Sequence, residues 1–242
     1  MGYNFLLSSG GDIDFMIKGV FPYQLFDQTV WITTTHISAL IVIIVMTILC
    51  FIANRVMKKA TEIPGNLQSV YEIIVDMLDN FILNIMGARY APAFRNYIGT
   101  IFIFILLSNT SGLFGLRNPT ADYGTTLALG LLTFSIVNIS ELIYCKPLGY
   151  LKNQLKPMSF FLPLNIIGKL AQPISLSLRL FANNLSGIIM LAMIYVLLKP
   201  IAYVWPAFLH AFFDMFIGFM QSFVFCMLSM TYITIAVSNS EE

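Results

Sequence analysis

The chain has 242 residues, of which 58% are hydrophobic and only 10% are charged, and its mean hydropathy is +0.81. Soluble globular proteins carry about 25% charged residues, so this composition excludes a soluble fold and indicates an integral membrane protein. The formal net charge of +1 offers neither the basic surface that binds nucleic acid nor an acidic tail for a cationic partner.

Five apolar segments are long enough to cross a membrane as helices, which takes about 20 largely apolar residues. In chain order they cover residues 36–57, 96–116, 123–146, 163–198 and 203–238. Residues 1–30 come before them as an outer N-terminal segment and lack the pattern of a signal peptide. We therefore predict a single all-α membrane domain over residues 1–242.

A different pattern covers residues 66–86, between the first and second spans. Its apolar residues, among them Val70, Ile74 and Leu78, recur every three or four positions, while the acidic residues lie mostly elsewhere. This spacing predicts an amphipathic helix that lies at the membrane surface or packs on the spans.

Lysine and arginine residues beside the spans set the predicted orientation, because they favour the inner side of a membrane. Eight of them fall on one side if the chain weaves through five spans, and three fall on the other side with four aspartates. The N-terminus is therefore predicted outside and the C-terminus inside.

The last two spans each hold one charged residue well inside an apolar segment. Arg179 is the only charge between Lys169 and Lys199, and Asp214 is the only charge between Lys199 and Glu241. Charges at such depth are costly and usually mark an ion path or a partner charge.

Other polar residues share helical faces with these two charges. Asn183 follows Arg179 by four residues, and His210, Asp214 and Gln221 form one polar stripe on the last span. Two interpretations stay open: the stripe lines an ion path, or Arg179 and Asp214 form a structural pair that holds an antiparallel hairpin together. The spacing alone does not identify the ion.

Several other residues have simpler competing explanations. Glu141, near the inner end of the third span, is either part of the path or an interfacial charge. Asp122 is expected to cap the N-terminus of the third span, and His36 to be an interfacial histidine. The three cysteines lie in apolar stretches without metal or disulfide spacing, and we interpret all of them as buried small hydrophobic residues.

Four strings together resemble the F-type ATP synthase subunit a family. PISLSLRLFAN at residues 173–183 is similar to the family's PxSLxLRLFxN signature. SNTSGLFG at 108–115, NPTAD at 118–122 and the stretch 221–232 resemble, in the same order, further family strings at span ends. The resemblance covers about residues 30–238, which is essentially the whole predicted fold.

The resemblance implies a non-catalytic stator subunit, whose last two spans lie against a ring of c subunits that carry mid-membrane carboxyl groups. Protons reach the ring through one half-channel and leave through another. Arg179 would be the essential charge barrier, and Asp214 would load or release protons in the entry half-channel. Asn183 and Gln221 would orient the arginine, and His210 and Glu141 are further candidates for the path.

The same resemblance implies the peripheral-stalk subunit b and the lipid bilayer as further partners. It implies a bacterial plasma membrane as the location, and no cofactor or metal. A sodium-coupled version of the subunit stays open, because the ring carboxyl site that selects the ion belongs to another chain.

The chain departs from the family pattern in three places. Gly187 is followed by Ile188, where relatives often carry an acidic residue or a histidine, and Ala182 replaces a usual glycine. Lys169 stands where relatives tend to be acidic. These changes leave Asp214 as the only carboxylate in the last two spans, and they bear on the channel lining and the choice of ion.

Two other classes of protein fit less well. A secondary transporter with a mid-membrane arginine would show internal repeats with paired broken helices, and the two halves of the chain show no convincing repeat. A membrane enzyme would need a nucleophile–base or metal constellation, which two histidines and three scattered cysteines do not supply. The sequence contains no P-loop string, so nucleotide chemistry would belong to partners.

Overall fold

The computed structural model describes residues 19–25, 28–58, 60, 65–155, 162–197 and 205–238. This part of the chain is almost wholly helical, and five of its helical segments are long and apolar enough to cross a membrane. The predicted all-α membrane fold with five spans is thereby confirmed. Residues 1–18 and 26–27 of the expected outer N-terminal segment lie outside the described residues.

A short β-hairpin is the exception that the sequence analysis does not predict. Strands β1 (Gly19–Leu25) and β2 (Gln28–Thr33) pair antiparallel, with Leu25 opposite Gln28. Both strands are rich in the β-branched and aromatic residues that favour sheets, but each is too short to stand out beside the long apolar spans. The hairpin leads directly into the first span.

The first span is helix α1 (Thr34–Met57), and His36 caps its N-terminus. The Thr33 hydroxyl lies 2.7 Å from His36 Nδ1, and the Thr33 backbone N–H donates to the same nitrogen at 3.4 Å. A residue three positions into a helix often satisfies the free N–H of the cap residue in this way. His36 therefore stabilises the boundary between the hairpin and α1.

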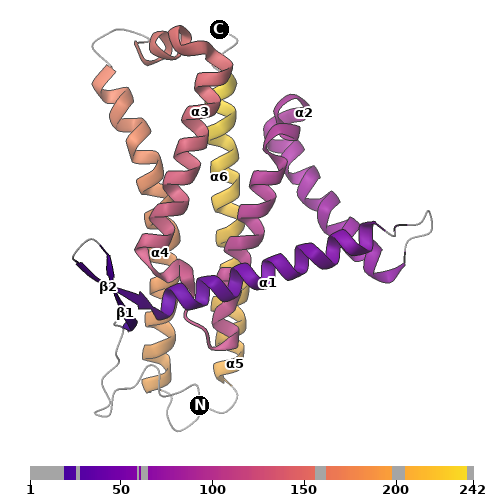
Figure 1. Cartoon of the computed structure of the whole chain (residues 1–242), viewed down its shortest axis with the longest axis vertical. Helices are drawn as coiled ribbons and strands as arrows, with labels where there is room; N and C mark the ends of the chain where they lie inside the picture. Colours follow the sequence, from indigo (N-terminus) through magenta and orange to yellow (C-terminus); the bar gives the residue numbers. More distant parts are fainter. Residues whose placement is uncertain are drawn as a thin grey trace.

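Helix α2 (Asn66–Thr110) combines two elements that the sequence predicts as separate. Its helical pattern runs from the amphipathic segment into the second span, and only Gly87, with φ 72° and ψ 164°, leaves helical geometry. This backbone conformation is essentially restricted to glycine. Gly87 therefore bends α2 into two arms, which Figure 1 shows as an inverted V beside the bundle.

One ion pair joins the two arms of α2. Arg95 Nη1 donates to Asp79 Oδ2 at 2.6 Å across 16 residues. The first arm also contacts the last span, because the rings of Phe81 and Phe223 stack with centroids 4.8 Å apart. The predicted amphipathic segment is therefore packed on the spans through one face.

After α2, the chain passes through two short 3₁₀ turns, η2 (Ser111–Phe114) and η3 (Pro119–Ala121), and then forms α3 (Tyr123–Leu155). Helix α4 (Leu162–Leu197) runs back along the bundle. The last span is built from α5 (Trp205–His210), a π-helical segment η5 (Ala211–Ile217) and α6 (Gly218–Ser238). In Figure 1 these helices stand side by side, and α1 runs across them.

Helix α3 contacts both of the last two spans, whereas α2 packs on the last span. Helices α4 and α6 contact each other, but α4 has its most extensive contact with α3, and α6 with α2. Gly130 permits the close approach of α3 and α4, since a Cβ there would lie 2.8 Å from the Pro173 carbonyl oxygen. Small residues at such contacts are typical of membrane helices, where packing replaces the hydrophobic effect between helices.

Apolar side chains fill the interior and also cover the outside of the bundle. Ile105 from α2, Leu180 from α4 and Phe225 from α6 are almost fully buried in one core cluster. Large apolar side chains are exposed along α1 and the first arm of α2. Cys226 is buried as predicted, whereas the prediction for Cys50 is wrong, because it lies exposed on α1. The side chain of Cys145 lies outside the described residues.

Candidate functional site

Asp214 is held in a π-helical segment of the last span. It is 8% exposed, and its Oδ2 lies 2.7 Å from Nδ1 of His210, one turn earlier. A π-helix widens the turn and is frequent at functional sites. The structure thus joins two of the predicted site residues in one hydrogen-bonded pair.

The end of α2 and the two 3₁₀ turns bring further polar groups to this pair. A Cβ on Gly112 would lie 3.0 Å from Asp214 Oδ2 and 2.8 Å from Asn118 Oδ1, so these groups meet around the bare glycine. The Ser111 hydroxyl donates to the Ser108 carbonyl oxygen at 2.7 Å and also lies within 3.3 Å of Asn118 Oδ1. We call Ser111, Gly112, Asn118, His210 and Asp214 the Asp214 cluster.

A second buried network connects the same turns to α6. Thr120 Oγ1 donates to Asn109 Oδ1 at 2.6 Å, and Asn109 Nδ2 donates to the Gly218 carbonyl oxygen at 3.1 Å. Asn109, Asn118 and Thr120 were not singled out as site residues from the sequence. Their signal was the concentration of polar residues in the strings 108–115 and 118–122, at depths where the flanking residues are apolar.

Gln221 and Asn183 also lie together, between the last two spans. Asn183 Nδ2 donates to Gln221 Oε1 at 3.2 Å. Gln221 is 7% exposed, and its Nε2 is buried without a hydrogen-bond partner among the described residues. An amide donor left unpaired inside a protein is costly, which indicates that its partner comes from outside this chain or from water.

Arg179 lies on the exposed face of α4, one turn before Asn183. Within the described part of the chain, it makes no hydrogen bond or ion pair, and Asp214 is engaged by His210 instead. The interpretation of Arg179 and Asp214 as a structural pair is therefore wrong. Their separation follows from the packing of α3 against α4, which turns the arginine outward.

A permanently charged guanidinium on an apolar helix face needs a counter-charge, because a charge exposed to lipid is costly. No carboxylate of the described residues supplies one. The face around Arg179 carries small and apolar residues, among them Ser175, Leu178 and Ala182, which are also exposed. This combination fits docking against another membrane protein that presents an acidic group.

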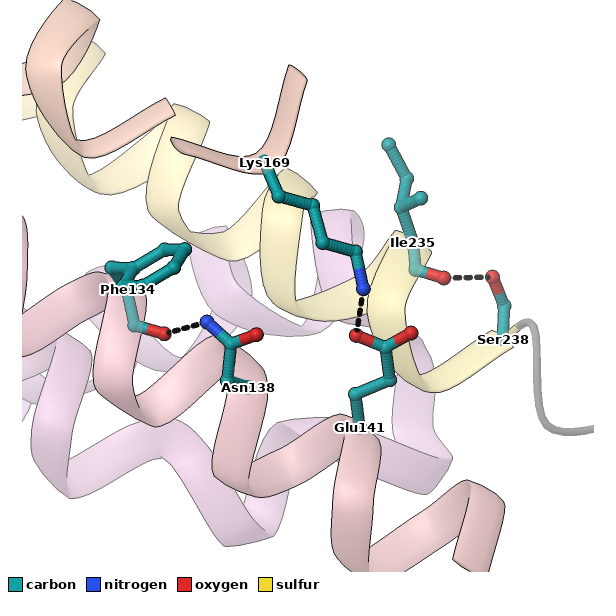
Figure 2. Close-up of polar contacts among 6 residues, drawn as sticks. All are labelled: Phe134, Asn138, Glu141, Lys169, Ile235 and Ser238. Atoms are coloured by element: carbon teal, nitrogen blue, oxygen red, sulfur yellow. Dashed lines mark hydrogen bonds and ion pairs between the residues drawn. The ribbon is translucent and has the colours of Figure 1, made fainter. Parts of the chain in front are cut away.

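Glu141 lies away from the Asp214 cluster, towards the end of the bundle where α4 begins and α6 ends. Figure 2 shows its side chain pointing to that of Lys169, whose Nζ donates to Glu141 Oε2 at 2.6 Å. Glu141 is 2% exposed, so it is not a charge at the surface of this chain. The departure at Lys169 thus has a structural partner in Glu141.

Asp122 behaves as the sequence predicts. Its Oδ1 accepts a hydrogen bond from the Gly124 backbone N–H at 3.1 Å, at the start of α3. The capping role is confirmed. Among the described residues, no group of three or more His, Cys, Asp or Glu side chains is arranged to hold a metal ion.

Comparison with known proteins adds independent evidence. The family model described as ATP synthase A chain matches residues 36–234. The sodium ion specific ATP synthase subunit a of Propionigenium modestum is 32% identical, over 93% of this chain and 79% of that protein. ATP synthase subunit a of Trichlorobacter lovleyi is 35% identical over 79% of this chain and 82% of that protein. ATP synthase subunit a of a Sulfurihydrogenibium species is 34% identical over 85% and 98%, respectively.

Proposed function

Because the chain belongs to the ATP synthase A chain family and is thus the ion-translocating stator subunit of the membrane sector, we propose that Arg179 is the charge barrier of its ion path. The path to this barrier runs through the Asp214 cluster on one side. The supporting observation is that Arg179 is exposed and has no hydrogen bond or ion pair in the described part of the chain.

The ring of c subunits is the partner that this surface fits. A carboxylate that moves past the exposed face of α4 would meet the Arg179 guanidinium, which keeps its proton under all ordinary conditions. A lysine could lose its proton when buried, so arginine is the better barrier. Opposite charges held at this point keep the carboxylate ionised and block direct passage of protons between the two sides.

Asn183 and Gln221 lie one turn and one helix away from the arginine. Their mutual hydrogen bond fixes the Gln221 amide one helix away from the arginine. We assign both residues to orienting the arginine and the arriving carboxylate. Asp214 lies seven residues before Gln221, or roughly 10 Å along the helix. From this position it passes ions towards the carboxylate beside Arg179.

The Asp214–His210 pair favours protons as the coupling ion. Both groups bind and release protons, and the 2.7 Å separation of Oδ2 and Nδ1 permits transfer between them. Hard metal cations prefer sites built from oxygen atoms alone, which this pair is not. The sodium-coupled version is the second candidate, since a relative with 32% identity is named as sodium ion specific.

The chain crosses the membrane several times, and we place it in a bacterial plasma membrane with the N-terminus outside. In this orientation the Asp214 cluster opens to the outer side, and the end of the bundle that holds Glu141 faces inside. Moving one charge through the membrane potential yields about 2.3 kcal/mol per 100 mV. Subunit b and lipid cover the remaining apolar surface of α1 and the first arm of α2.

The test is ATP-driven acidification of inside-out membrane vesicles that contain the whole complex. Arg179→Ala is expected to abolish pumping while the complex still assembles. Arg55→Ala is the matched control, because Arg55 is an exposed arginine at the end of α1 and should pump normally. Normal pumping by Arg179→Ala would refute the barrier, and ATP-driven uptake of sodium ions in place of acidification would favour the sodium-coupled version.

A further inference from the structure

The ion pair of Glu141 and Lys169, in which only the carboxylate is buried and the lysine side chain is 27% exposed, has no part in the barrier or in the Asp214 cluster. It joins α3 to α4 across 28 residues, and its carboxylate is almost fully buried. An ion pair buried in this way seldom adds stability compared with well-packed apolar residues. Its presence within a membrane protein therefore calls for a functional explanation.

A small cavity lies beside the pair. Its volume is about 60 Å³, and three helices contribute its walls: Val137, Glu141, Lys169, Gln172, Tyr232, Ile235 and Ala236. A water molecule takes up about 30 Å³ in the liquid, so one or two waters fit. Four of the lining side chains are polar, which makes a filled cavity favourable and an empty one costly.

The cavity is aligned with Arg179 along α4. Gln172 precedes Arg179 by seven residues, which places both on one side of the helix about 10 Å apart. Ser175 lies between them and is exposed on the same side. The Asn183–Gln221 contact lies beyond Arg179 in the other direction, so the arginine separates this cavity from the Asp214 cluster.

We propose that this cavity is the inner vestibule of the ion path, in which Glu141 is the ion-binding group and Lys169 is the residue that positions it. The inference rests on the proposed function. A proton released by a ring carboxyl beside Arg179 passes to water in the cavity, then to the Glu141 carboxylate, and finally to water on the inner side. Lys169 compensates the carboxylate charge while the site is empty and holds the side chain at the cavity wall.

Sidedness of labelling tests the vestibule directly. Gln172→Cys should react with a membrane-impermeant methanethiosulfonate reagent applied from the inner side only, because thiols react as thiolates in water. The control is Leu170→Cys, which is exposed on the opposite side of α4 and should stay unlabelled in lipid. Labelling of the unsubstituted chain gives the baseline for the native cysteines. A Gln172→Cys chain that is unlabelled, or labelled from the outer side, would overturn the proposal.

A second test measures passive proton flow through membranes from which the catalytic sector has been removed. It distinguishes a role of the ion pair in transport from a purely structural role in holding α3 and α4 together. Lys169→Arg should conduct like the unsubstituted protein, whereas Lys169→Met should lose conduction. The double variant Glu141→Leu with Lys169→Leu removes both charges together, so it should assemble and yet conduct about tenfold less or worse. Full conduction by the assembled double variant would show that the pair is only a tether.

The two proposals fail in different ways. If Arg179→Ala stops ATP-driven pumping while the double variant pumps and conducts normally, only the vestibule is refuted. If Arg179→Ala pumps normally, the proposed barrier itself is refuted.

Discussion

Substitution of Gly112 by alanine probes the geometry of the Asp214 cluster. The new methyl group would lie 2.8 Å from Asn118 Oδ1 and 3.0 Å from the Asp214 carboxylate, whereas ordinary contacts begin at 3.4 Å. Asn118 must therefore move by about 0.6 Å, and Asp214 by a few tenths of an ångström. Overpacking of this kind costs about 1–3 kcal/mol, and a displacement near 1 Å at a reacting group reduces rates about 100-fold.

We expect Gly112→Ala to assemble and to lower ATP-driven acidification by about tenfold or more. Gly99→Ala is the matched control, since Gly99 lies in α2 with no atom within 4 Å of an added Cβ. Alanine also favours a helix interior by about 0.5–1 kcal/mol, so this control should pump normally. Normal pumping by an assembled Gly112→Ala complex would mean that ions do not pass the Asp214 cluster as described.

Two other substitutions test the bend in α2. Gly87→Ala places a side chain at φ 72° and ψ 164° and should destabilise the detergent-solubilised protein by about 1–3 kcal/mol, seen as a lower midpoint of thermal unfolding; an unchanged midpoint would contradict the strain. Arg95→Ala breaks an ion pair in which the arginine side chain is 55% exposed. This substitution should lower the free energy of unfolding by less than about 1 kcal/mol and leave pumping intact. A large loss of pumping would show that the pair does more than join the two arms of α2 weakly.

The sequence determined the membrane fold and singled out Arg179 for simple physical reasons. Long apolar runs have no other stable location than a bilayer, and helices are the natural way to satisfy their backbone there. A lone arginine inside such a run is costly, so it stands out in the sequence as a candidate functional residue. The string that surrounds Arg179 then carried the family resemblance, which the comparisons confirmed.

Which polar groups meet was decided only by the tertiary structure. Helical spacing grouped His210 with Asp214 correctly, because residues four apart share a face. It gave no information on Gly112 or Asn118, which reach Asp214 from turns about 100 residues earlier in the chain. For Arg179 the sequence left open an ion path or a structural pair, and for Glu141 an ion path or an interfacial charge. Both choices depended on which helix each side chain faces.

The remaining outcomes follow from the same distinction between local and long-range interactions. Composition and periodicity report what each residue prefers, so they predicted the spans and the cap at Asp122. They do not report how helices rotate about their axes, and that rotation turns Arg179 outward and pairs Lys169 with Glu141. Close packing at small residues such as Gly130 fixes that rotation. The rotation of each helix is therefore known only from the tertiary structure.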